Sequence, residues 1–172
     1  MELIQGRLIL RPIRYDDKES LAKLANNKKI WLSLRDTFPL PYRIADAENF
    51  IEMTKNFGSW RVFAITYDYE FCGVISLILQ HDVYCKSAEI GYWLGESYWN
   101  KGIASTAVSL LTTYGFEDLA LERIFAAVFS GNQASIRVLE KCAFRQEGLF
   151  RKAVFKNNVL LDELRFARLK GE

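Results

Sequence analysis

The chain has few cysteines and no long apolar run. Its three cysteines, Cys72, Cys85 and Cys142, are an odd number without the spacing of metal ligands. We therefore expect reduced thiols, two of them in the core, and no metal site. No apolar run approaches the ~20 residues of a transmembrane helix. The first residues also lack the order of a signal peptide. These absences predict a cytoplasmic protein.

An excess of one charge is also missing. The sequence has 23 basic and 21 acidic residues, a net charge of +2, which is too small to indicate nucleic acid or a membrane surface as partner. The chain length gives a separate expectation: 172 residues suit a single domain, which we expect over residues 1–172. A domain of this length can bury about 70% of its unfolded surface.

Two common phosphate-binding patterns, GxxxxGK[ST] and GxGxxG, do not occur. The stretch SYWNKGIASTA, residues 97–107, instead places Gly102 ahead of small residues with helical spacing. Glycine lets the backbone approach a ligand closely, and the first N–H groups of a helix attract phosphate. The stretch therefore predicts a site for a phosphate-bearing ligand. A plain turn glycine is the alternative.

Hydrophobic periodicity predicts a strand, two or three helices, three strands, a helix, a strand, a helix and two strands. This order indicates a mixed α/β fold around one sheet. Asp16 and Glu19 resemble a capping box at the first helix. The expected strands span 6–14, 60–67, 71–80, 88–95 and 123–129, with a final hairpin over 144–169 that turns near Asn157 and Asn158. The later helices are expected over 28–35, over 47–57, after Gly102 and over 132–142.

Two segments, EIGYWLGESYWNKGIASTAV (89–108) and LERIFAAVFSGNQASIRVLEKCAFRQEG (121–148), resemble the GNAT acetyltransferase superfamily. The likeness is greatest to its Rim-type branch of ribosomal-protein N-terminal acetyltransferases, whose first strand resembles RLILRPIRYDD (7–17). The resemblance implies a GNAT fold, a central mixed sheet of about seven strands flanked by helices with a splayed parallel pair. It also implies an acetyl-CoA-dependent N-acetyltransferase that transfers the acetyl group directly in a ternary complex.

The resemblance also implies where acetyl-CoA binds. Backbone N–H groups of residues 100–104 would hold the pyrophosphate, the N–H of Trp93 or Leu94 would lie near the acetyl carbonyl, and Lys141 or Arg137 would meet the 3′-phosphate. The implied cofactor-binding residues are Tyr92, Trp93, Leu94, Trp99, Asn100, Lys101, Gly102, Ile103, Ala104, Asn132, Ser135 and Lys141.

Four positions depart from the family pattern. Asn100 and Ala143 stand where relatives usually have glycine, Leu139 where many have a tyrosine acid, and Thr106 where Rim-type relatives often have glutamate. Asparagine tolerates the left-handed conformation, so the loop can still form. The loss of the tyrosine is tolerable because a thiol with a pKa near ~8.5 gives a fair leaving group.

Three residues are catalytic candidates. Glu89, between two apolar neighbours, is the candidate base and can take a proton directly or through water. In the family, residues matching Asn132 contact the pantetheine or a bound water, and those matching Ser135 donate near the thiolate. The alternatives are a surface Glu89 paired with Lys or Arg, and an Asn132 that only caps a helix.

The acceptor is expected to be a primary amine. A peptide α-amine has a pKa of about 7.7–8.0 and a lysine about 10.4, so the neutral lysine amine is ~3 kcal/mol harder to obtain. One base candidate therefore favours a protein N-terminal α-amine. Small amines (amino sugars, amino acids, antibiotics), a non-catalytic acetyl-CoA sensor and a homodimer stay open. Trp31, Arg35 and Tyr84 are substrate-binding candidates. Arg151, Lys152 and Lys156 form a basic group for which we favour solvated surface, with contact to an acidic substrate as the alternative.

Overall fold

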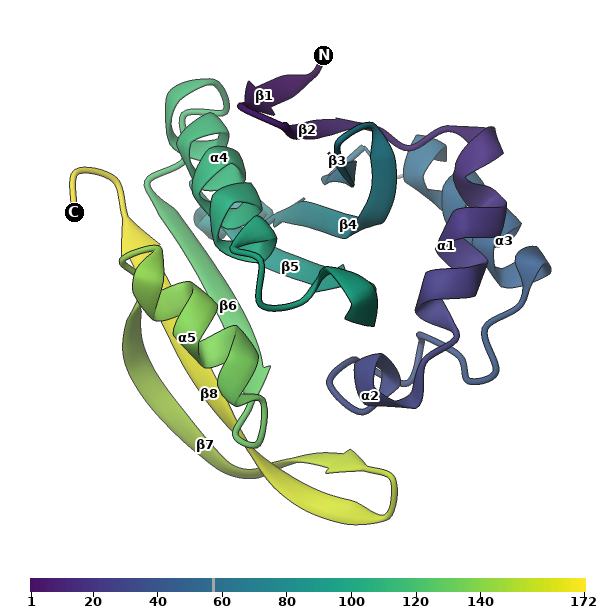
Figure 1. The fold of residues 1–172 in the computed structure, drawn as a ribbon. Coiled ribbons are helices and arrows are strands. Elements are labelled where there is room, and N and C mark those ends of the chain that lie inside the picture. Colours follow the sequence, from purple (N-terminus) through teal and green to yellow (C-terminus); the bar gives the residue numbers. More distant parts are fainter. Residues whose placement is uncertain (57) are drawn as a thin grey trace.

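One mixed sheet organises the chain. The computed structural model describes residues 1–56 and 58–172. Its eight strands follow the order β1-β2-β3-β4-β5-β6-β8-β7 (Figure 1). The strands are β1 (Leu3–Gln5), β2 (Leu8–Pro12), β3 (Trp60–Tyr67), β4 (Glu70–Leu79), β5 (Ser87–Leu94), β6 (Arg123–Phe129), β7 (Arg145–Lys156) and β8 (Val159–Leu169). The helices are α1 (Lys18–Ala25), α2 (Lys28–Trp31), α3 (Ile44–Asn56), α4 (Ile103–Glu117) and α5 (Gln133–Lys141), with short 3₁₀ turns η1 (Tyr15–Asp17), η2 (Asp82–Tyr84) and η3 (Glu96–Tyr98).

This architecture confirms the mixed α/β fold, with one strand more than the expected seven. The additional strand, β1, pairs antiparallel with β2 through Leu3 opposite Leu10. Three residues are too few for an alternating pattern to be recognised. The predicted strand 123–129 is confirmed as β6, which lies between β5 and β8 inside the sheet.

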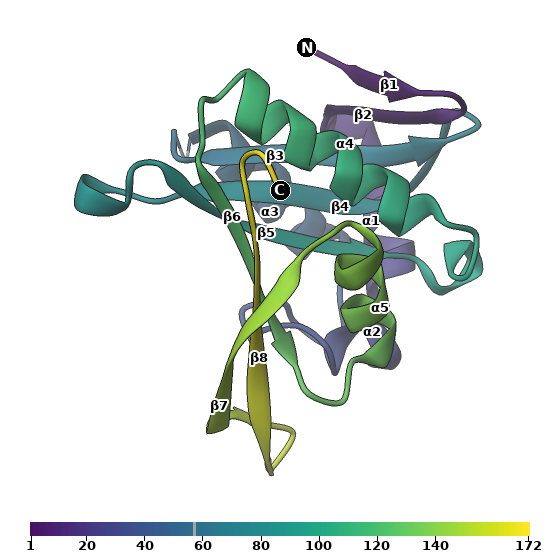
Figure 2. The same ribbon diagram turned by 90° about the vertical axis from the view of Figure 1, so that its left-hand side faces the viewer.

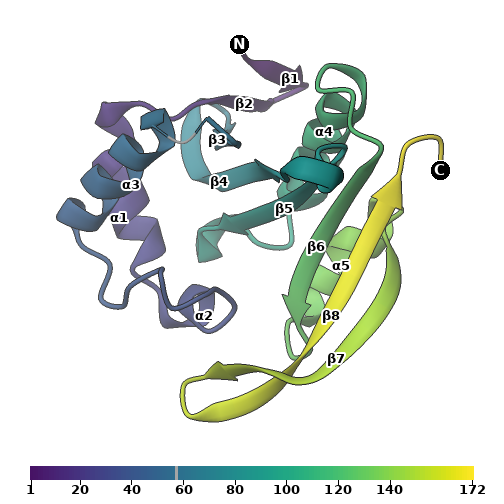
Figure 3. The same cartoon turned by 180° about the vertical axis from the view of Figure 1, so that it is seen from behind.

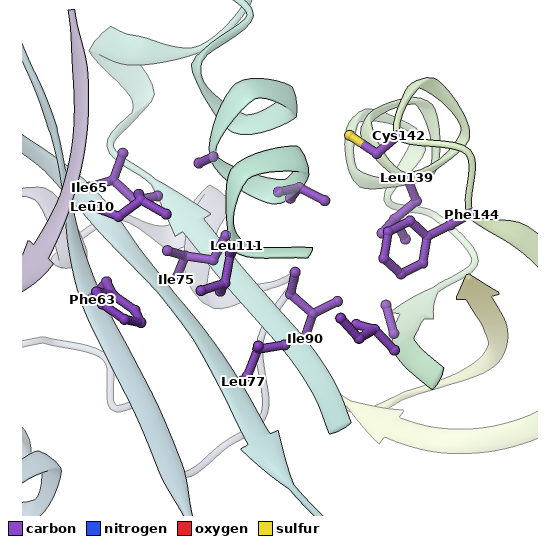
Figure 4. Packing of buried hydrophobic residues seen from close by; sticks show 14 of the residues in the cluster. Leu10, Phe63, Ile65, Ile75, Leu77, Ile90, Leu111, Leu139, Cys142 and Phe144 are labelled. Atoms are coloured by element: carbon purple, nitrogen blue, oxygen red, sulfur yellow. The ribbon is translucent and has the colours of Figure 1, made fainter. Parts of the chain in front are cut away.

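Helices cover both faces of the sheet. Figure 2 shows α4 in front of the strands, with α1 and α3 behind them. Each face has its own hydrophobic cluster: one joins the sheet to α4 and α5, and the other joins it to α1 and α3. In Figure 4, Leu111 of α4 lies over Ile75 of β4, and Leu139 lies beside Phe144. In the part of the chain that the structure describes, no helix combines the length and apolar character needed to cross a membrane.

The N-cap of α1 is Asp17, one residue after the predicted cap Asp16. The carboxylate of Asp17 accepts a hydrogen bond from the backbone N–H of Arg14 at 2.7 Å and two from the guanidinium of Arg11 at 2.7 and 2.8 Å. The predicted Asp16–Glu19 capping box is therefore wrong. Asp17 is 7% exposed, so this ion pair joins β2 to the start of α1 with little solvent screening.

Two other helix ends differ from the prediction. Helix α2 ends at Trp31 rather than Arg35, and the chain turns away from the helix before the extended backbone imposed by Pro39 and Pro41. Helix α3 begins at Ile44, three residues before the predicted start at residue 47. The Asp46 carboxylate accepts a hydrogen bond from the Arg43 N–H at 2.7 Å, which satisfies a backbone donor at this helix start. The predicted end of α3, Phe57, lies outside the described residues.

The predicted final hairpin and the two buried thiols are confirmed, and a second hairpin joins β3 to β4. Strands β3 and β4 join at Asp68 and Tyr69, and β7 and β8 at Asn157 and Asn158. All four turn residues have positive φ, as tight turns between antiparallel strands require. The three cysteines are free, with Cys72 and Cys142 buried and Cys85 exposed. Burial raises the pKa of Cys72 to about 12.

An alanine, Ala143, follows the C-cap of α5 at a position where glycine is usual. The N–H of Phe144 donates to the carbonyl of Leu139, and the N–H of Ala143 donates to that of Glu140, both at 3.0 Å. This pair of bonds is a Schellman motif, in which the residue after the cap is left-handed. Ala143 has φ of 62°. The chain therefore forms the usual helix end although alanine replaces the family's glycine, and Ala143 is held in a strained conformation.

We predict that Ala143→Gly stabilises the protein by about 1 kcal/mol, because glycine removes the cost of the left-handed conformation. Urea unfolding followed by circular dichroism measures the change. Ala134→Gly is the matched control: it sits on the exposed first turn of the same helix, where glycine costs about 1 kcal/mol. Equal destabilisation by both substitutions would contradict the strain at Ala143.

Candidate active site

Strands β5 and β6 are paired in parallel over a short distance. The pairing joins residues 87–89 to residues 123–125. Beyond it, β5 stays paired with β4 as far as Leu94, and β6 stays paired with β8 as far as Phe129. Figure 3 shows the two strands diverging beyond the paired residues. The expected splayed parallel pair is therefore present, and the inner edges of both strands face the opening.

A glycine permits the close approach of β4 to the end of β5. Gly73 lies opposite Leu94. A Cβ atom at Gly73 would lie 2.2 Å from the carbonyl oxygen of Trp93 and 2.9 Å from the Cα of Leu94. These are backbone atoms, so a larger residue would have to displace the strand end that leads into the glycine loop.

A cavity of about 540 Å³ lies beside the end of β5. Its walls come from α2, the end of β5, η3 and the loop after it, the first turn of α4, and α5 from its first to its last residue. We call it the cofactor cavity. It brings together every residue predicted to bind the cofactor, namely Tyr92, Trp93, Leu94, Trp99, Asn100, Lys101, Gly102, Ile103, Ala104, Asn132, Ser135 and Lys141.

The glycine loop leaves the start of α4 open to a ligand. Gly102 is the N-cap residue with φ of 76°, and no side chain caps the helix. Asn100 is also left-handed, with φ of 60°, so the asparagine adopts the conformation for which relatives use glycine. The indole N–H of Trp99 donates to the Leu94 carbonyl at 2.8 Å and ties the loop to β5. Uncapped N–H groups at a helix start fit a phosphate group.

Cations surround the same cavity. Lys101, Arg137 and Lys141 come from the loop and α5, as the sequence led us to expect, and Lys29 comes from α2. Lys29 was missed because it lies about 70 positions earlier in the chain. Its ammonium pairs with Glu96, and this contact together with Asn27 lowers the pKa of the Glu96 carboxyl. The charge of the cavity fits a polyanionic ligand such as the phosphates of coenzyme A.

Two hydroxyl groups meet across the opening between β5 and α5. Tyr92 Oη lies 2.8 Å from Ser135 Oγ and 3.3 Å from the Ser135 carbonyl oxygen. Asn132 Oδ1 accepts from the Ser135 N–H at 3.1 Å. Asn132 is thus the N-cap of α5, the alternative role considered from the sequence, and it also lines the cavity. Leu139 is fully buried, so this position offers no acid to the site.

A second cavity of about 840 Å³ opens on the other side of these residues. We call it the acceptor cavity. It shares Ser33, Tyr92, Trp93, Asn132 and Ser135 with the cofactor cavity. A ligand in one cavity therefore meets a ligand in the other at the hydroxyl pair.

Aromatic rings form one wall of the acceptor cavity. Phe38 lies between Tyr42 and Trp93, with ring centroids 4.7 and 5.8 Å apart. Phe50 and Trp60 line the same cavity. Desolvation within this wall raises the pKa of Tyr42, so its hydroxyl stays neutral. The wall is apolar and fits the carbon skeleton of an acceptor.

Glu89 lies in the acceptor cavity with a basic partner. Its Oε1 accepts from Arg35 Nη2 at 2.7 Å, and the two side chains are 20% and 65% exposed. Arg35 also lines the cavity. Glu89 is thus paired with an arginine, the alternative considered from the sequence. The exposed Arg35 makes the pairing displaceable by another cation.

Two predicted substrate residues lie elsewhere. Among the residues that line the two cavities, neither Trp31 nor Tyr84 appears. Tyr84 is 69% exposed in the turn between β4 and β5. The ammonium of Lys156 lies 3.7 Å from the centroid of the Trp31 ring. Lys156 is 3% exposed and pairs with Asp36 at 2.6 Å, so its prediction as solvated surface is wrong. The contact joins β7 to the chain after α2, across 120 positions.

Comparison with known proteins identifies the family. A family model described as an acetyltransferase (GNAT) domain matches residues 7–145. The chain belongs to the GNAT acetyltransferase family. It is 37% identical over 108 residues to a putative ribosomal N-acetyltransferase, YdaF of Bacillus subtilis, a match that spans 63% of this chain and 58% of YdaF. It is 28% identical to YnaD, an uncharacterised N-acetyltransferase of the same organism, over 100% of this chain and 99% of YnaD.

A solved structure agrees with both the fold and the cofactor. RimL, a ribosomal L7/L12 alpha-N-protein acetyltransferase solved with coenzyme A, matches with a TM-score of 0.89 and 25% identity, over 98% of each chain. These similarities support the Rim-type branch. The protein is an N-acetyltransferase of the GNAT family, and acetyl-CoA is its co-substrate.

We predict that Gly102→Ala weakens acetyl-CoA binding at least tenfold, because both the loop conformation and its open face change. Calorimetric titration measures the affinity. Gly6→Ala is the matched control, since Gly6 also has positive φ, at 59°, and open space around a Cβ. Each substitution is expected to cost about 1–2 kcal/mol of stability. Equal affinity of the two variants for acetyl-CoA would contradict the role of the loop.

Proposed function

We propose that the protein acetylates the α-amine of a protein or peptide N-terminus. The observation that carries the proposal is the junction of the two cavities at Tyr92, Trp93, Asn132 and Ser135, with Glu89 on the acceptor side. The similarity to RimL, named for α-N acetylation of a ribosomal protein, supports a protein acceptor. An α-amine also needs less help to lose its proton than a lysine side chain.

The proposed reaction needs four tasks from the chain. The start of α4, with Lys101, holds phosphate, and the end of β5 supplies backbone N–H groups from Trp93 or Leu94 to the acetyl oxygen. The amine, arriving as an ammonium ion, competes with Arg35 for the Glu89 carboxylate, which then takes its proton. Ser135 donates a hydrogen bond to the departing sulfur.

A small-molecule acceptor is the second candidate. The acceptor cavity, of about 840 Å³, is large enough to enclose a whole drug-sized amine, since ligand pockets measure about 300–1,000 Å³. Its aromatic wall suits an amine with an apolar skeleton. A peptide places just its first residues in such a cavity, whereas an amino sugar or antibiotic fills it.

The first experiment is calorimetric titration with acetyl-CoA, with dephospho-coenzyme A as the control. Micromolar binding, about −8 kcal/mol, is expected, and weaker binding of the control places a cation at the 3′-phosphate. A panel of peptides, amino sugars and other small amines then identifies the acceptor by thiol release. Tight binding without any product would support a non-catalytic sensor, and no binding would contradict the proposed function.

We predict that Glu89→Gln lowers kcat/KM for the acceptor by about 100-fold, because the amine loses its proton acceptor. The affinity for acetyl-CoA should be unchanged. Glu163→Gln is the matched control: Glu163 lines the same cavity but pairs with Arg165 at 2.7 Å. An equal loss in both variants would show that cavity charge, rather than proton transfer, matters.

The homodimer stays a prediction, and the hairpin β7–β8 is its expected interface. Leu149, Phe150, Phe155, Val159 and Leu160 are 49–64% exposed there, and β7 is an edge strand of the sheet. Such exposed apolar groups on an edge favour association. Sedimentation velocity should show a dimer that Phe155→Asp weakens. A wild-type monomer at every concentration would contradict it.

A further inference from the structure

The hydroxyl pair at the junction raises a question of hydrogen placement. Each hydroxyl has one proton, and Tyr92 Oη and Ser135 Oγ are 2.8 Å apart. If Ser135 donates to Tyr92, the tyrosine proton can go to the Ser135 carbonyl at 3.3 Å, and neither proton faces the cofactor cavity. If Tyr92 donates to Ser135, the serine proton is free to point elsewhere.

The surroundings favour the second arrangement when an anion is present. Desolvation raises the pKa of Tyr92, so the tyrosine keeps its proton and remains a donor. The Ser135 N–H is held by Asn132 at 3.1 Å, which fixes the backbone that carries the serine. An anion in the cofactor cavity attracts the serine proton, and hydrogen bonds in such a chain strengthen one another.

We propose that Tyr92 is a positioning residue that donates to Ser135 Oγ and thereby aims the Ser135 hydroxyl proton at the sulfur that departs in acetyl transfer. This inference rests on the proposed function. It assigns Tyr92 a role beyond lining the cofactor cavity. The phenol comes from β5 and the serine from α5, so the pair exists because the strands diverge and the helix start lies against the opening.

The role proposed for Tyr92 agrees with the movement of bonds and protons in acetyl transfer. The amine lone pair forms the new C–N bond, and the C–S bond breaks with its electron pair going to sulfur. The ammonium ion gives one proton to Glu89 before it attacks, and the nitrogen loses a second proton to water once the C–N bond has formed. Ser135 donates a hydrogen bond to the thiolate without losing its own proton, and Tyr92 does the same for Ser135. No further reactant is needed.

The test uses free coenzyme A, whose thiol ionises, and acetyl-CoA, whose sulfur does not. If the hydroxyl pair stabilises the thiolate, binding lowers the pKa of the coenzyme A thiol below its value in solution. The affinity for coenzyme A then rises with pH, relative to acetyl-CoA, until the free thiol is itself ionised. Lowering the thiol pKa by one unit corresponds to a tenfold rise in the affinity ratio between a pH well below the bound pKa and a pH well above the free one.

The charged groups that line the cofactor cavity are Lys29, Lys101, Arg137 and Lys141, and Glu89 pairs with Arg35 in the acceptor cavity. Their effect on the phosphates and pantetheine, which both ligands share, cancels in this ratio. Cys142 at the end of α5 influences Tyr92, but burial raises the pKa of its thiol, so it stays neutral over most of the range. The sulfur of the ligand is the difference between the two titrations.

Calorimetry on the full chain compares the wild type with three variants. Tyr92→Phe and Ser135→Ala should each lose the rise in the ratio while still binding acetyl-CoA. Tyr98→Phe is the matched control: Tyr98 lines the same cavity, but its hydroxyl donates to Glu70 at 3.0 Å. It should keep the full tenfold rise.

The outcomes separate the inference from the function on which it rests. A flat ratio in the wild type, or a full rise in Tyr92→Phe, overturns the role of Tyr92 and leaves acetyl-CoA binding intact. No binding of either ligand overturns the proposed function as well. If Tyr92→Phe does not fold, Ser135→Ala removes the same pair from the other side, and retention of the rise in that variant overturns the proposal.

Discussion

The short parallel pairing of β5 and β6 is the constraint on which the site depends. The two strands share hydrogen bonds through residues 87–89 and 123–125, and each then continues with its outer neighbour alone. Backbone groups left without a partner inside a protein cost free energy unless a ligand, water or another segment meets them. The inner edge of β5 therefore favours an extended ligand, which can pair with its backbone groups. The antiparallel partners β4 and β8 keep both strands in place while the gap stays open.

The same opening determines where chemistry can occur. The start of α5 lies against the gap, so Asn132 and Ser135 reach side chains of β5 that a continuous sheet would have covered. Both cavities end at this point, and they share these two residues with Tyr92 and Trp93. In the proposed reaction, the phosphate-bearing ligand binds on the α4 side and the amine binds on the aromatic side. The helix start of α4 and the cations around it then favour the orientation that brings the acyl end inward.

Sequence reasoning reached the cofactor side because that side is local. Strands, α4 and α5 follow from periodicity within 15 residues, and Gly102 and Asn132 are residue types that suit the helix starts where they lie. Their assignment to acetyl-CoA came from the resemblance to the GNAT superfamily. The errors have the opposite cause. The Asp17 cap depends on Arg11 of β2, Lys29 reaches the cofactor cavity from α2, and β1 is too short for a pattern. Arg11 and Asp17 are six positions apart, but their pairing depends on how β2 meets the start of α1. The place of Lys29 depends on a contact with Glu96, 67 positions later.

The acceptor side is held together by contacts between distant segments, and this explains why it is the less predictable half. Arg35 meets Glu89 across 54 positions, and Lys156 meets Asp36 across 120. Both contacts hold the chain between α2 and α3, which supplies Arg35 and Phe38 to the acceptor cavity. A buried ammonium needs its partners, because removal of either Asp36 or the Trp31 ring leaves it desolvated and less compensated. The acceptor wall can therefore change with the segment 34–43 or with the β7–β8 hairpin, neither of which lines the cofactor cavity. In this chain, the residues around the cofactor cavity are therefore set mainly by local sequence, and those of the acceptor cavity by long-range packing.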